Sequence, residues 1–358
     1  MTLGAVEAAR SLGHGVEIAL AMELDPEIRK IYDKNFPSVV GSDRADVAER
    51  FDGRIGKRLT LTERRTAKDV GPVDLLLGGP PCQGHSNLNN HTRRSDPKNA
   101  LYLRMLRAIE VLRPKSVVIE NVPEVLHSTY RVVPRVVNFL DSLDYAVVQT
   151  VIGAGALGVA QLRSRHVLLA TKKPVAITND NLELRKRTTP RTVGWAIRDL
   201  VYEHDGSDDI FRTPSSLSDD NLERARYLHR HKKSDLPNSE RPDCHKDKPK
   251  HKYKSMYGRL SWGLPAQTIT TGFGSPGQGR YFHPTELRTL TPHEAARIQF
   301  FPDWFDFSTA KHRRVLAESI GNAVPPKMSF TLSRAVLSAL LSSVVEPAEA
   351  EEKIRDVA

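Results

Sequence analysis

GGPPCQGHS, at residues 78–86, is the stretch of sequence that most limits what this chain can be. It continues VDLLLGG (73–79), whose apolar run ending in glycine is typical of a strand buried in a parallel sheet. The glycines and prolines end that strand and force a tight turn, which places the thiol of Cys82 at the strand's carboxyl end. Ligands bind at this edge of open parallel sheets, so Cys82 is a candidate functional residue.

A carboxylate is expected at the same edge. SVVIENV (116–122) reads as the next buried strand, and Glu120 lies near its carboxyl end, one crossover helix after Cys82. The alternative is a buried core cysteine and a helix-capping acid, which is the preferred interpretation of an isolated cysteine. The Pro-Pro-Cys turn and the paired acid favour function, so the sequence predicts a thiol and a carboxylate facing one cleft.

Short apolar runs alternate with helical periodicity through the first half of the chain, which predicts βαβ units and a parallel sheet. Globular signals return near 288, where TPHEAARIQFF predicts a capped helix and 328–345 a terminal helix. Before the resemblance below is considered, the fold class is therefore α/β. The expected strands lie at 17–25, 73–79, 116–122 and 165–171, the expected helices at 26–36 and 98–114, and a helix leading into a strand at 136–152.

The composition changes from about residue 186, where prolines, polar residues and charges replace the buried runs. Residues 221–260 hold twelve Lys/Arg against five Asp/Glu, so this segment carries +7 of the chain's formal net charge of +10. Such a concentration favours an anionic partner, with nucleic acid the leading candidate. Two cysteines are too few for a disulfide framework, and no apolar run is long enough to span a membrane, so we expect a cytoplasmic protein.

Five motifs occur here in a known order: GGPPCQGHS, ENV, QLRSR, RTLTPHEAARIQFFPD and IGNAVPP. In these motifs the chain resembles the DNA (cytosine-5) methyltransferase family over residues 15–175 and 260–340. The resemblance implies a Rossmann-like methyltransferase sheet with helices on both faces, plus a smaller, irregular target-recognition domain. It also implies methyl transfer from S-adenosylmethionine to carbon 5 of a flipped cytosine in duplex DNA. The expected parts are a catalytic domain at 1–185, a recognition domain at 186–285, a return to the catalytic domain at 286–345 and an exposed acidic tail at 346–358.

The family's mechanism assigns four catalytic residues. The Cys82 thiolate would add to carbon 6 of cytosine, and Glu120 would hold the amino group and ring nitrogen 3. Arg163 and Arg165, in QLRSR, would orient the base and supply positive charge that favours the thiolate. Without the family match, both arginines would read as surface residues at the start of a strand.

The resemblance also implies DNA contacts, because a cytosine inside a duplex must be flipped out before it can react. The polar stretch after Cys82 matches the family's mobile catalytic loop, which closes on DNA, although a solvated loop is an equal alternative for any single residue in it. PAQTITT (265–271) matches a motif that supports the recognition domain. The predicted DNA-contacting residues are Ser86, Asn89, Arg93, Arg94, Thr268 and Thr270.

The predicted S-adenosylmethionine site draws on both ends of the chain. Glu23 would take the ribose hydroxyls. Asp46, with Asp43 as a rival, would accept a hydrogen bond from the adenine amino group. Taken singly, each acid is more typical of a surface. The methionine side would be lined by Gly79, Pro81, Leu101 and Asn322.

One departure from the family concerns the start of the sequence. Members begin with a strand and an FxGxG turn that cradles the cofactor, whereas MTLGAVEAARSLG resembles the helix after that turn. We expect a start codon assigned too late rather than a truncated copy, a sheet lacking one central strand, and weak cofactor binding. Equal, tight binding of S-adenosylmethionine by this chain and by one extended upstream would contradict that expectation.

Two other functions are compatible with the sequence. One branch of the family methylates tRNA, but the sizeable basic segment before TITT favours DNA. A catalytically inactive DNA-binding relative is the second, against which the intact Cys82, Glu120 and QLRSR argue. We expect a monomer. The resemblance allows an associated restriction endonuclease as a partner. We expect no metal site. The residues that suggest zinc have no standard finger spacing: His229, His231, Cys244, His245 and His251.

Overall fold

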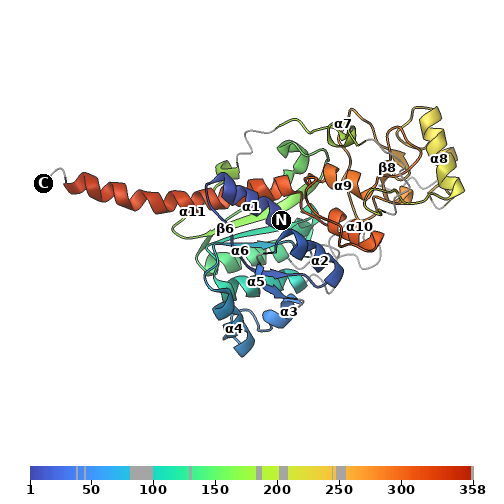
Figure 1. Cartoon of the computed structure of the whole chain (residues 1–358). Helices are drawn as coiled ribbons and strands as arrows, with labels where there is room; N and C mark the ends of the chain where they lie inside the picture. The colour runs from blue at the N-terminus through green and yellow to red at the C-terminus, as the bar shows by residue number, and fades with distance from the viewer. Residues whose placement is uncertain are drawn as a thin grey trace.

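The computed structural model describes residues 1–37, 39–43, 46–80, 100–128, 131–182, 188–200, 209–243, 245–246 and 255–355. These residues form an α/β body, with a second, less regular part at one end and a long helix that projects from the other end (Figure 1).

The sheet elements are β1 (Ile18–Met22), β2 (Val39–Asp43), β3 (Leu75–Gly78), β4 (Ser116–Asn121), β5 (Tyr145–Gly153), β6 (Ser164–Lys172), β7 (Gly258–Arg259) and β8 (Arg280–Phe282). The α-helices are α1 (Thr2–Ser11), α2 (Pro26–Asn35), α3 (Val47–Arg50), α4 (Leu61–Val70), α5 (Ala100–Leu112), α6 (Val132–Ser142), α7 (Val193–Ile197), α8 (Asp219–Arg230), α9 (Pro292–Ile298), α10 (Arg313–Gly321) and α11 (Pro326–Arg355). Each strand and helix expected from the sequence is therefore present, with ends shifted by a few residues except at the end of α11.

The central sheet has the strand order β3-β4-β6-β5. β3 and β4 are parallel, but β6 runs antiparallel to both of its neighbours. The expectation of a purely parallel sheet was therefore wrong at β6. Only residues 154–163 separate β5 from β6, which is enough for a hairpin-like return but too short for the crossover that a parallel pair requires.

β1 and β2 form a separate parallel pair. Among the described residues no hydrogen bonding joins this pair to β3, so the strands do not form one continuous sheet.

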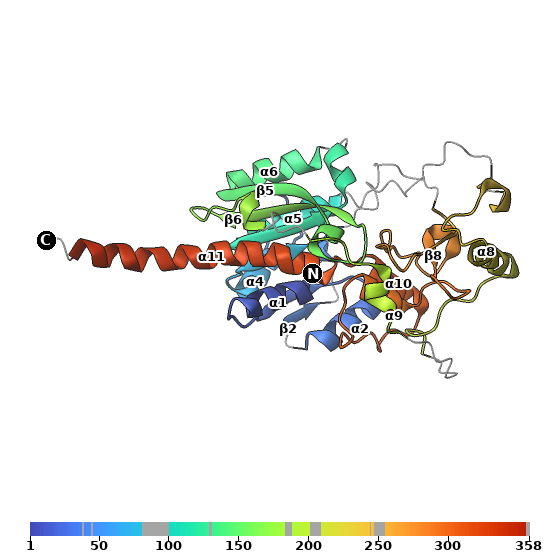
Figure 2. The ribbon, with the colours of Figure 1, turned by 90° about the horizontal axis from the view of Figure 1, so that it is seen from above.

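Helices cover both faces of the central sheet, as the resemblance implied (Figure 1). Alternate residues of β4 face opposite ways: Val117 and Ile119 pack with α5 and α6, whereas Val118 packs with α11. α1 lies beside α11 on that second face, as Figure 2 also shows. All six residues of β4 are buried, which explains why the strand was readable as a continuous apolar run.

The helix that ends the chain is longer than expected. α11 was predicted for 328–345 with an exposed acidic tail after it, but the helix continues to Arg355 and extends beyond the body (Figure 1). Among the described residues, no helix combines the length and apolar character needed to cross a membrane.

Candidate functional site

The carboxyl ends of β3 and β4 bring the first two predicted positions together. β3 pairs with β4 so that Gly78 lies opposite Ile119, one residue before Glu120. A Cβ placed on Gly79 would lie 3.7 Å from Oε2 of Glu120. Asn121 Nδ2 donates a hydrogen bond to the carbonyl oxygen of Pro80 at 3.3 Å. The chain that leads to Cys82 therefore leaves the sheet beside Glu120 and is held there by Asn121.

Glu120 forms an ion pair with Arg165, which comes from the adjacent strand β6. Nε of Arg165 lies 2.6 Å from Oε1 of Glu120, and only 8% of the surface of Glu120 is exposed. The approach is not aligned as a hydrogen bond, and Oε1 accepts none from the described residues. A buried carboxylate oxygen with acceptor capacity left is suited to receive an N–H group from a ligand.

α1 begins close to the same edge. The amino group of Met1 is buried, which lowers its pKa to about 6, and its charge interacts with that of Glu120. Ser329 of α11 donates a hydrogen bond to the carbonyl oxygen of Met1 at 2.6 Å.

Arg163 has a different environment from Arg165. Its side chain is 3% exposed, and Nη1 donates to the carbonyl oxygens of Ile269 at 2.9 Å and Gly321 at 3.2 Å. The structure thus gives Arg163 a positioning role, in which it ties QLRSR to the TITT and IGN motifs. Contact of Arg163 with a base, which the resemblance implies, stays a prediction.

Two buried glutamines extend this connection. Nε2 of Gln161 donates to Oε1 of Gln299 at 2.6 Å, and Oε1 of Gln161 accepts from the backbone N–H of Ile269 at 3.2 Å. Nε2 of Gln299 donates to the carbonyl oxygen of Ile320 at 2.6 Å. We call Gln161, Arg163 and Gln299 the buried hub, because together they join four segments that are far apart in the sequence. A buried hydrogen-bonded network of this kind favours one arrangement of its segments.

Gly321 completes the contact between IGN and TITT. A Cβ at this position would lie 2.3 Å from the backbone nitrogen of Thr271 and 2.4 Å from the carbonyl carbon of Thr270. The two backbones therefore approach more closely than any residue with a side chain allows. Asn322 follows as the exposed residue that ends α10, and its backbone N–H donates to the carbonyl oxygen of Glu318 at 3.1 Å.

Thr268 and Thr270 have partners inside the protein. The hydroxyl of Thr268 donates to the carbonyl oxygen of Leu162 at 3.4 Å. The hydroxyl of Thr270 lies 3.0 Å from that of Tyr281, which in turn donates to the carbonyl oxygen of Thr268 at 2.9 Å. These bonds support the recognition segment, and direct DNA contact by either threonine stays a prediction.

The acids expected to hold the adenosine part of a cofactor follow β1 and β2. Oε1 of Glu23 accepts from the backbone N–H of Asp25 at 3.0 Å, which fixes the carboxylate just after β1. Oδ1 of Asp46 accepts from Ala48 at 2.9 Å as the N-cap of α3. One oxygen of each carboxylate has no hydrogen bond in the described structure, so both acids retain acceptors for hydroxyl or amino groups. The chemistry of this pair fits the adenosine of S-adenosylmethionine.

Several predicted residues lie outside the described part of the chain. The side chains of Asp43 and Leu101 are not described, although β2 and α5 are. Among the described residues, no three His, Cys, Asp or Glu side chains are placed to hold a metal ion, while Cys244 and His251 lie outside that set. The remaining predicted positions outside the described residues are Pro81, Cys82, Ser86, Asn89, Arg93 and Arg94.

A cavity of about 630 Å³ lies elsewhere, between α7 and the chain that follows α9. Its lining includes Trp195, Arg198, Phe300 and Phe301 and none of the predicted site residues. Volume alone therefore does not identify the functional site of this chain.

Sequence reasoning missed Gln161, Gln299, Gly321 and Asn121 as positioning residues. All four belong to motifs that were quoted as parts of a resemblance, so the signal was present. Their roles depend on which distant segments meet, and a single sequence does not state that.

Comparison with known proteins agrees with this arrangement. The family model described as "C-5 cytosine-specific DNA methylase" matches residues 2–338. The chain is similar to Type II methyltransferase M1.BsuMI of Bacillus subtilis, with 47% identity over 93% of this chain and 77% of the relative. It is 30% identical to Type II methylase M.HgiDII of Herpetosiphon aurantiacus over 90% of this chain and 89% of that protein. The solved structure of the S. pombe Dnmt2 methyltransferase shares the fold, with a TM-score of 0.61 at 16% identity over 97% and 96% of the two chains.

Proposed function

The chain belongs to the C-5 cytosine-specific DNA methylase family, and from that premise we propose how its own residues carry out the reaction. The chain methylates cytosine in DNA at carbon 5. We infer that the target is a cytosine flipped out of duplex DNA, that Cys82 is the nucleophile and that S-adenosylmethionine is the methyl donor. The observation that carries the proposal is the buried Glu120–Arg165 pair beside the point where the chain leaves β3 toward Cys82.

Carbon 5 of cytosine becomes nucleophilic only after another group adds to the ring. The proposed step is addition of the Cys82 thiolate to carbon 6, with Glu120 holding the amino group and ring nitrogen 3. The acceptor capacity of Oε1 supports this role, because that oxygen is buried and accepts no hydrogen bond from the described residues. After methyl transfer, loss of the proton from carbon 5 releases the cysteine.

Arg165 acts on the same carboxylate. Its guanidinium lies 2.6 Å from Glu120, so it fixes the carboxylate at the sheet edge. In the proposed mechanism it would also supply positive charge to the Cys82 thiol. Positive charge favours a thiolate near neutral pH. Arg163 acts through the buried hub, because its guanidinium holds the backbone of Ile269 and Gly321.

S-adenosylmethionine supplies an electrophilic methyl group on a sulfonium. Glu23 and Asp46 would hold its adenosine, because each carboxylate keeps one oxygen without a hydrogen bond in the described structure. Gly79, Pro81, Leu101 and Asn322 remain the proposed lining of the methionine side. A restriction endonuclease partner, a monomeric state and a cytoplasmic location remain proposals. The type II designation of the two bacterial relatives supports the first of these.

The proposal is tested by trapping. A duplex carrying 5-fluorocytosine at the target, incubated with the protein and S-adenosylmethionine, is expected to give a denaturation-resistant adduct, because fluorine at carbon 5 cannot leave as a proton does. Cys82→Ser should abolish the adduct and keep duplex binding, whereas Cys244→Ser should keep both.

Duplex binding without an adduct would instead support an inactive DNA-binding protein. Methylation of tRNA in preference to duplex DNA would support the RNA branch. Either result would overturn the proposal.

A further inference from the structure

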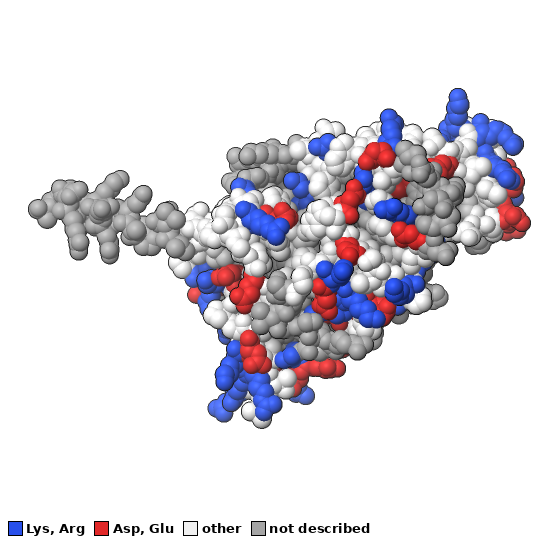
Figure 3. Space-filling model, in the orientation of Figure 1, with Lys and Arg blue, Asp and Glu red and all other residues white. Residues whose placement is uncertain are grey.

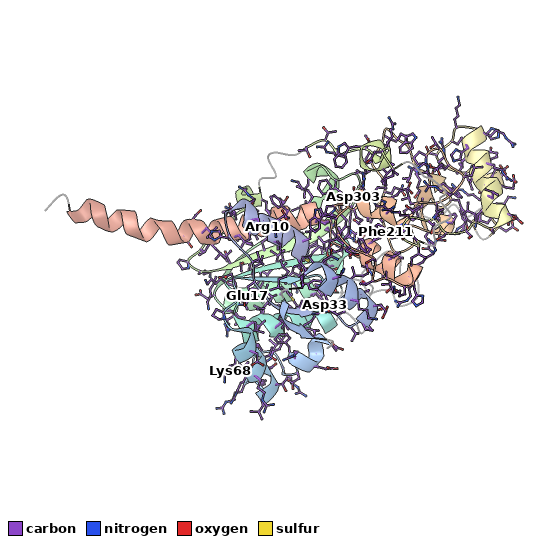
Figure 4. The ribbon with its side chains drawn as sticks, in the orientation of Figure 1. Arg10, Glu17, Asp33, Lys68, Phe211 and Asp303 are labelled. Carbon is purple, nitrogen blue, oxygen red and sulfur yellow. The ribbon has the colours of Figure 1, made fainter. Side chains whose placement is uncertain are left out.

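A second basic surface lies far from the recognition segment. We call it the α4 patch: it surrounds α4 and consists of Arg54, Lys57, Arg58, Arg64, Arg65 and Lys68. All six side chains belong to exposed residues, and within the described structure none of them forms an ion pair. Figure 3 shows Lys and Arg gathered at the end of the molecule where α4 lies, and Figure 4 labels Lys68 there.

The loop that carries half of the patch is fixed from inside. Arg107 of α5 is 1% exposed and donates to the carbonyl oxygens of Lys57 at 3.0 Å and Arg58 at 3.3 Å. The backbone N–H of Gly56 donates to Glu110 at 3.0 Å. Because these backbone groups are tied to α5, the loop presents its basic side chains from a rigid base.

Arg107 also fixes α4, through a buried ion pair with Glu63. Arg107 donates through Nε to Oε1 of Glu63 at 2.7 Å, and Glu63 is completely buried. Glu63 also forms the capping box of α4 with Thr60. With Glu63 and Thr66 facing the body, the exposed face of α4 presents Arg64, Arg65 and Lys68.

The charge of the patch is not locally compensated. Between residues 52 and 69 the exposed acids are Asp52 and Asp69, against six exposed cations, since Glu63 is buried against Arg107. Three exposed cations elsewhere on the body are paired with acids: Arg10 with Glu7, Lys30 with Glu27 and Lys115 with Asp74. An unpaired cluster on a rigid base creates a local positive potential that attracts polyanions.

The patch is separate from the site described above. α4 lies at one end of the body and α8, in the basic recognition segment, at the other (Figures 1 and 2). None of the six residues belongs to the predicted catalytic, cofactor-binding or DNA-contacting positions. A duplex held between the Glu120 edge and the recognition segment therefore leaves the patch available.

We propose that the α4 patch is a second, sequence-independent site for duplex DNA, which binds the phosphate backbone of a DNA segment other than the one that carries the target cytosine. The inference extends the activity on DNA and does not depend on Cys82. DNA fits better than an acidic protein, because protein interfaces need an apolar centre and the large apolar side chain exposed on α4 is Leu61 alone, at 72%. Interfaces with DNA are polar and strongly positive, as this surface is.

The test compares two triple variants with the same net charge. Arg64→Ala/Arg65→Ala/Lys68→Ala removes half of the patch, and Arg10→Ala/Lys30→Ala/Lys115→Ala removes three cations that are paired with acids. Binding of a duplex made only of A·T pairs, about 40 bp long, is measured over a range of salt concentrations. The patch variant should bind roughly tenfold more weakly at moderate salt, and its slope of log K against log salt should be smaller in magnitude by up to about 3. The slope of the control variant should stay within about 1 of that of the unsubstituted protein. Equal losses in the two variants, or none in either, would overturn the proposal.

A second measurement separates this site from the catalytic one. The protein trapped on a short 5-fluorocytosine duplex should still bind a labelled A·T duplex, as should the trapped control variant, whereas the trapped patch variant should not. If trapping fails in the unsubstituted protein, the proposed function is wrong, but the A·T measurement still shows whether the α4 patch binds DNA. If the patch variant unfolds, the single variants Arg64→Gln and Lys68→Gln are tested on the A·T duplex. Each should lower the slope of log K against log salt by about 1. An unchanged slope in both variants would contradict the site.

Discussion

The edge around Glu120 and the recognition segment at 209–283 are held together by different forces. At the edge, every residue of β4 is buried, and the buried hub joins backbone groups from four distant segments. In the proposed recognition segment, the part around α8 has a small core of Ala225, Leu228, Leu236 and Phe282 and an ion pair of Arg280 with Asp235 at 2.7 Å. Other residues of the segment, Leu260, Ala266, Ile269, Phe273 and Tyr281, belong to the larger core around α9 and α10. The edge therefore holds polar groups in fixed positions, whereas the part around α8 is a charged surface on a small core.

The difference teaches where change is tolerated. Removing one member of a buried network leaves its partner without a hydrogen bond, which lowers stability by the full desolvation cost of that polar group. An exposed ion pair contributes little to stability. We therefore predict that substitutions in the proposed recognition segment change DNA binding at small cost in stability, whereas substitutions at the edge or in the hub change the reaction rate or the stability of the fold.

The largest expected effect comes from Glu120→Gln. The substitution keeps the shape but removes the negative charge that pairs with Arg165, so kcat should fall by about 10²- to 10³-fold. Single-turnover methylation measures the rate, and binding of the target duplex should change less than threefold. Glu17→Gln, at an exposed residue before β1, is the control and should leave both unchanged. A loss of DNA affinity as large as the loss in rate would place Glu120 in recognition and break the comparison.

A smaller effect is expected where the hub meets the recognition segment. Gly321→Ala would force a Cβ within 2.4 Å of the Thr270 backbone, so the two segments must separate. Overpacking of this kind costs about 1–3 kcal/mol of unfolding free energy, measured by urea unfolding. Gly263→Ala is the matched control, since a Cβ there meets nothing within 4 Å, and it should stay within about 0.5 kcal/mol. Equal stability of the two variants would show that the IGN–TITT contact is loose.

The same contrast explains how much the sequence could predict. β4 and α5 were foreseen because they bury continuous or periodic apolar residues, which is a local signal. The β6 direction was missed because pairing direction depends on connection length and neighbours. α4 was missed although Thr60 and Glu63 form a capping box, which is a readable start signal.

The candidate site divides in the same way. Glu120 and Arg165 were predicted from two motifs, and their ion pair brings them together. The position of Cys82 was predicted but lies outside the described residues, so its distance from Glu120 stays a prediction. Contact of Arg163 with the base stays a prediction, and its burial against backbone carbonyls is a feature that no local pattern reveals. The sequence identifies the residue types at an edge better than the partners each side chain will choose.

The smallest expected effect uses one histidine from each region. Burial lowers the pKa of His166, on β6, and of His283, in the recognition segment, to about 4. Nδ1 of His283 accepts the backbone N–H of Glu286 at 3.0 Å, so protonation there would break that bond. Both histidines are neutral in the fold and charged in the unfolded chain below its pKa of about 6.5. Stability is thus complete above that pH and is lost as pH falls toward 4, by on the order of 1 kcal/mol per histidine at pH 5.5.

Urea unfolding between pH 7.5 and 4.5 measures this loss, and His166→Gln and His283→Gln should each flatten the pH dependence. The two variants also sharpen the contrast between the regions. Burial is the single cause of the lowered pKa of His166. At His283 the charges of Glu294 and Glu286 raise the pKa against burial, while those of Arg288 and His229 lower it, and Glu294 has the largest effect of the four. The net effect of those charges opposes burial, and salt screens charges but not burial, so high salt should strengthen the pH effect of His283 and leave that of His166 unchanged. A salt-dependent pH effect at His166 with none at His283 would show that the sheet, and not the proposed recognition segment, is the region where charge matters.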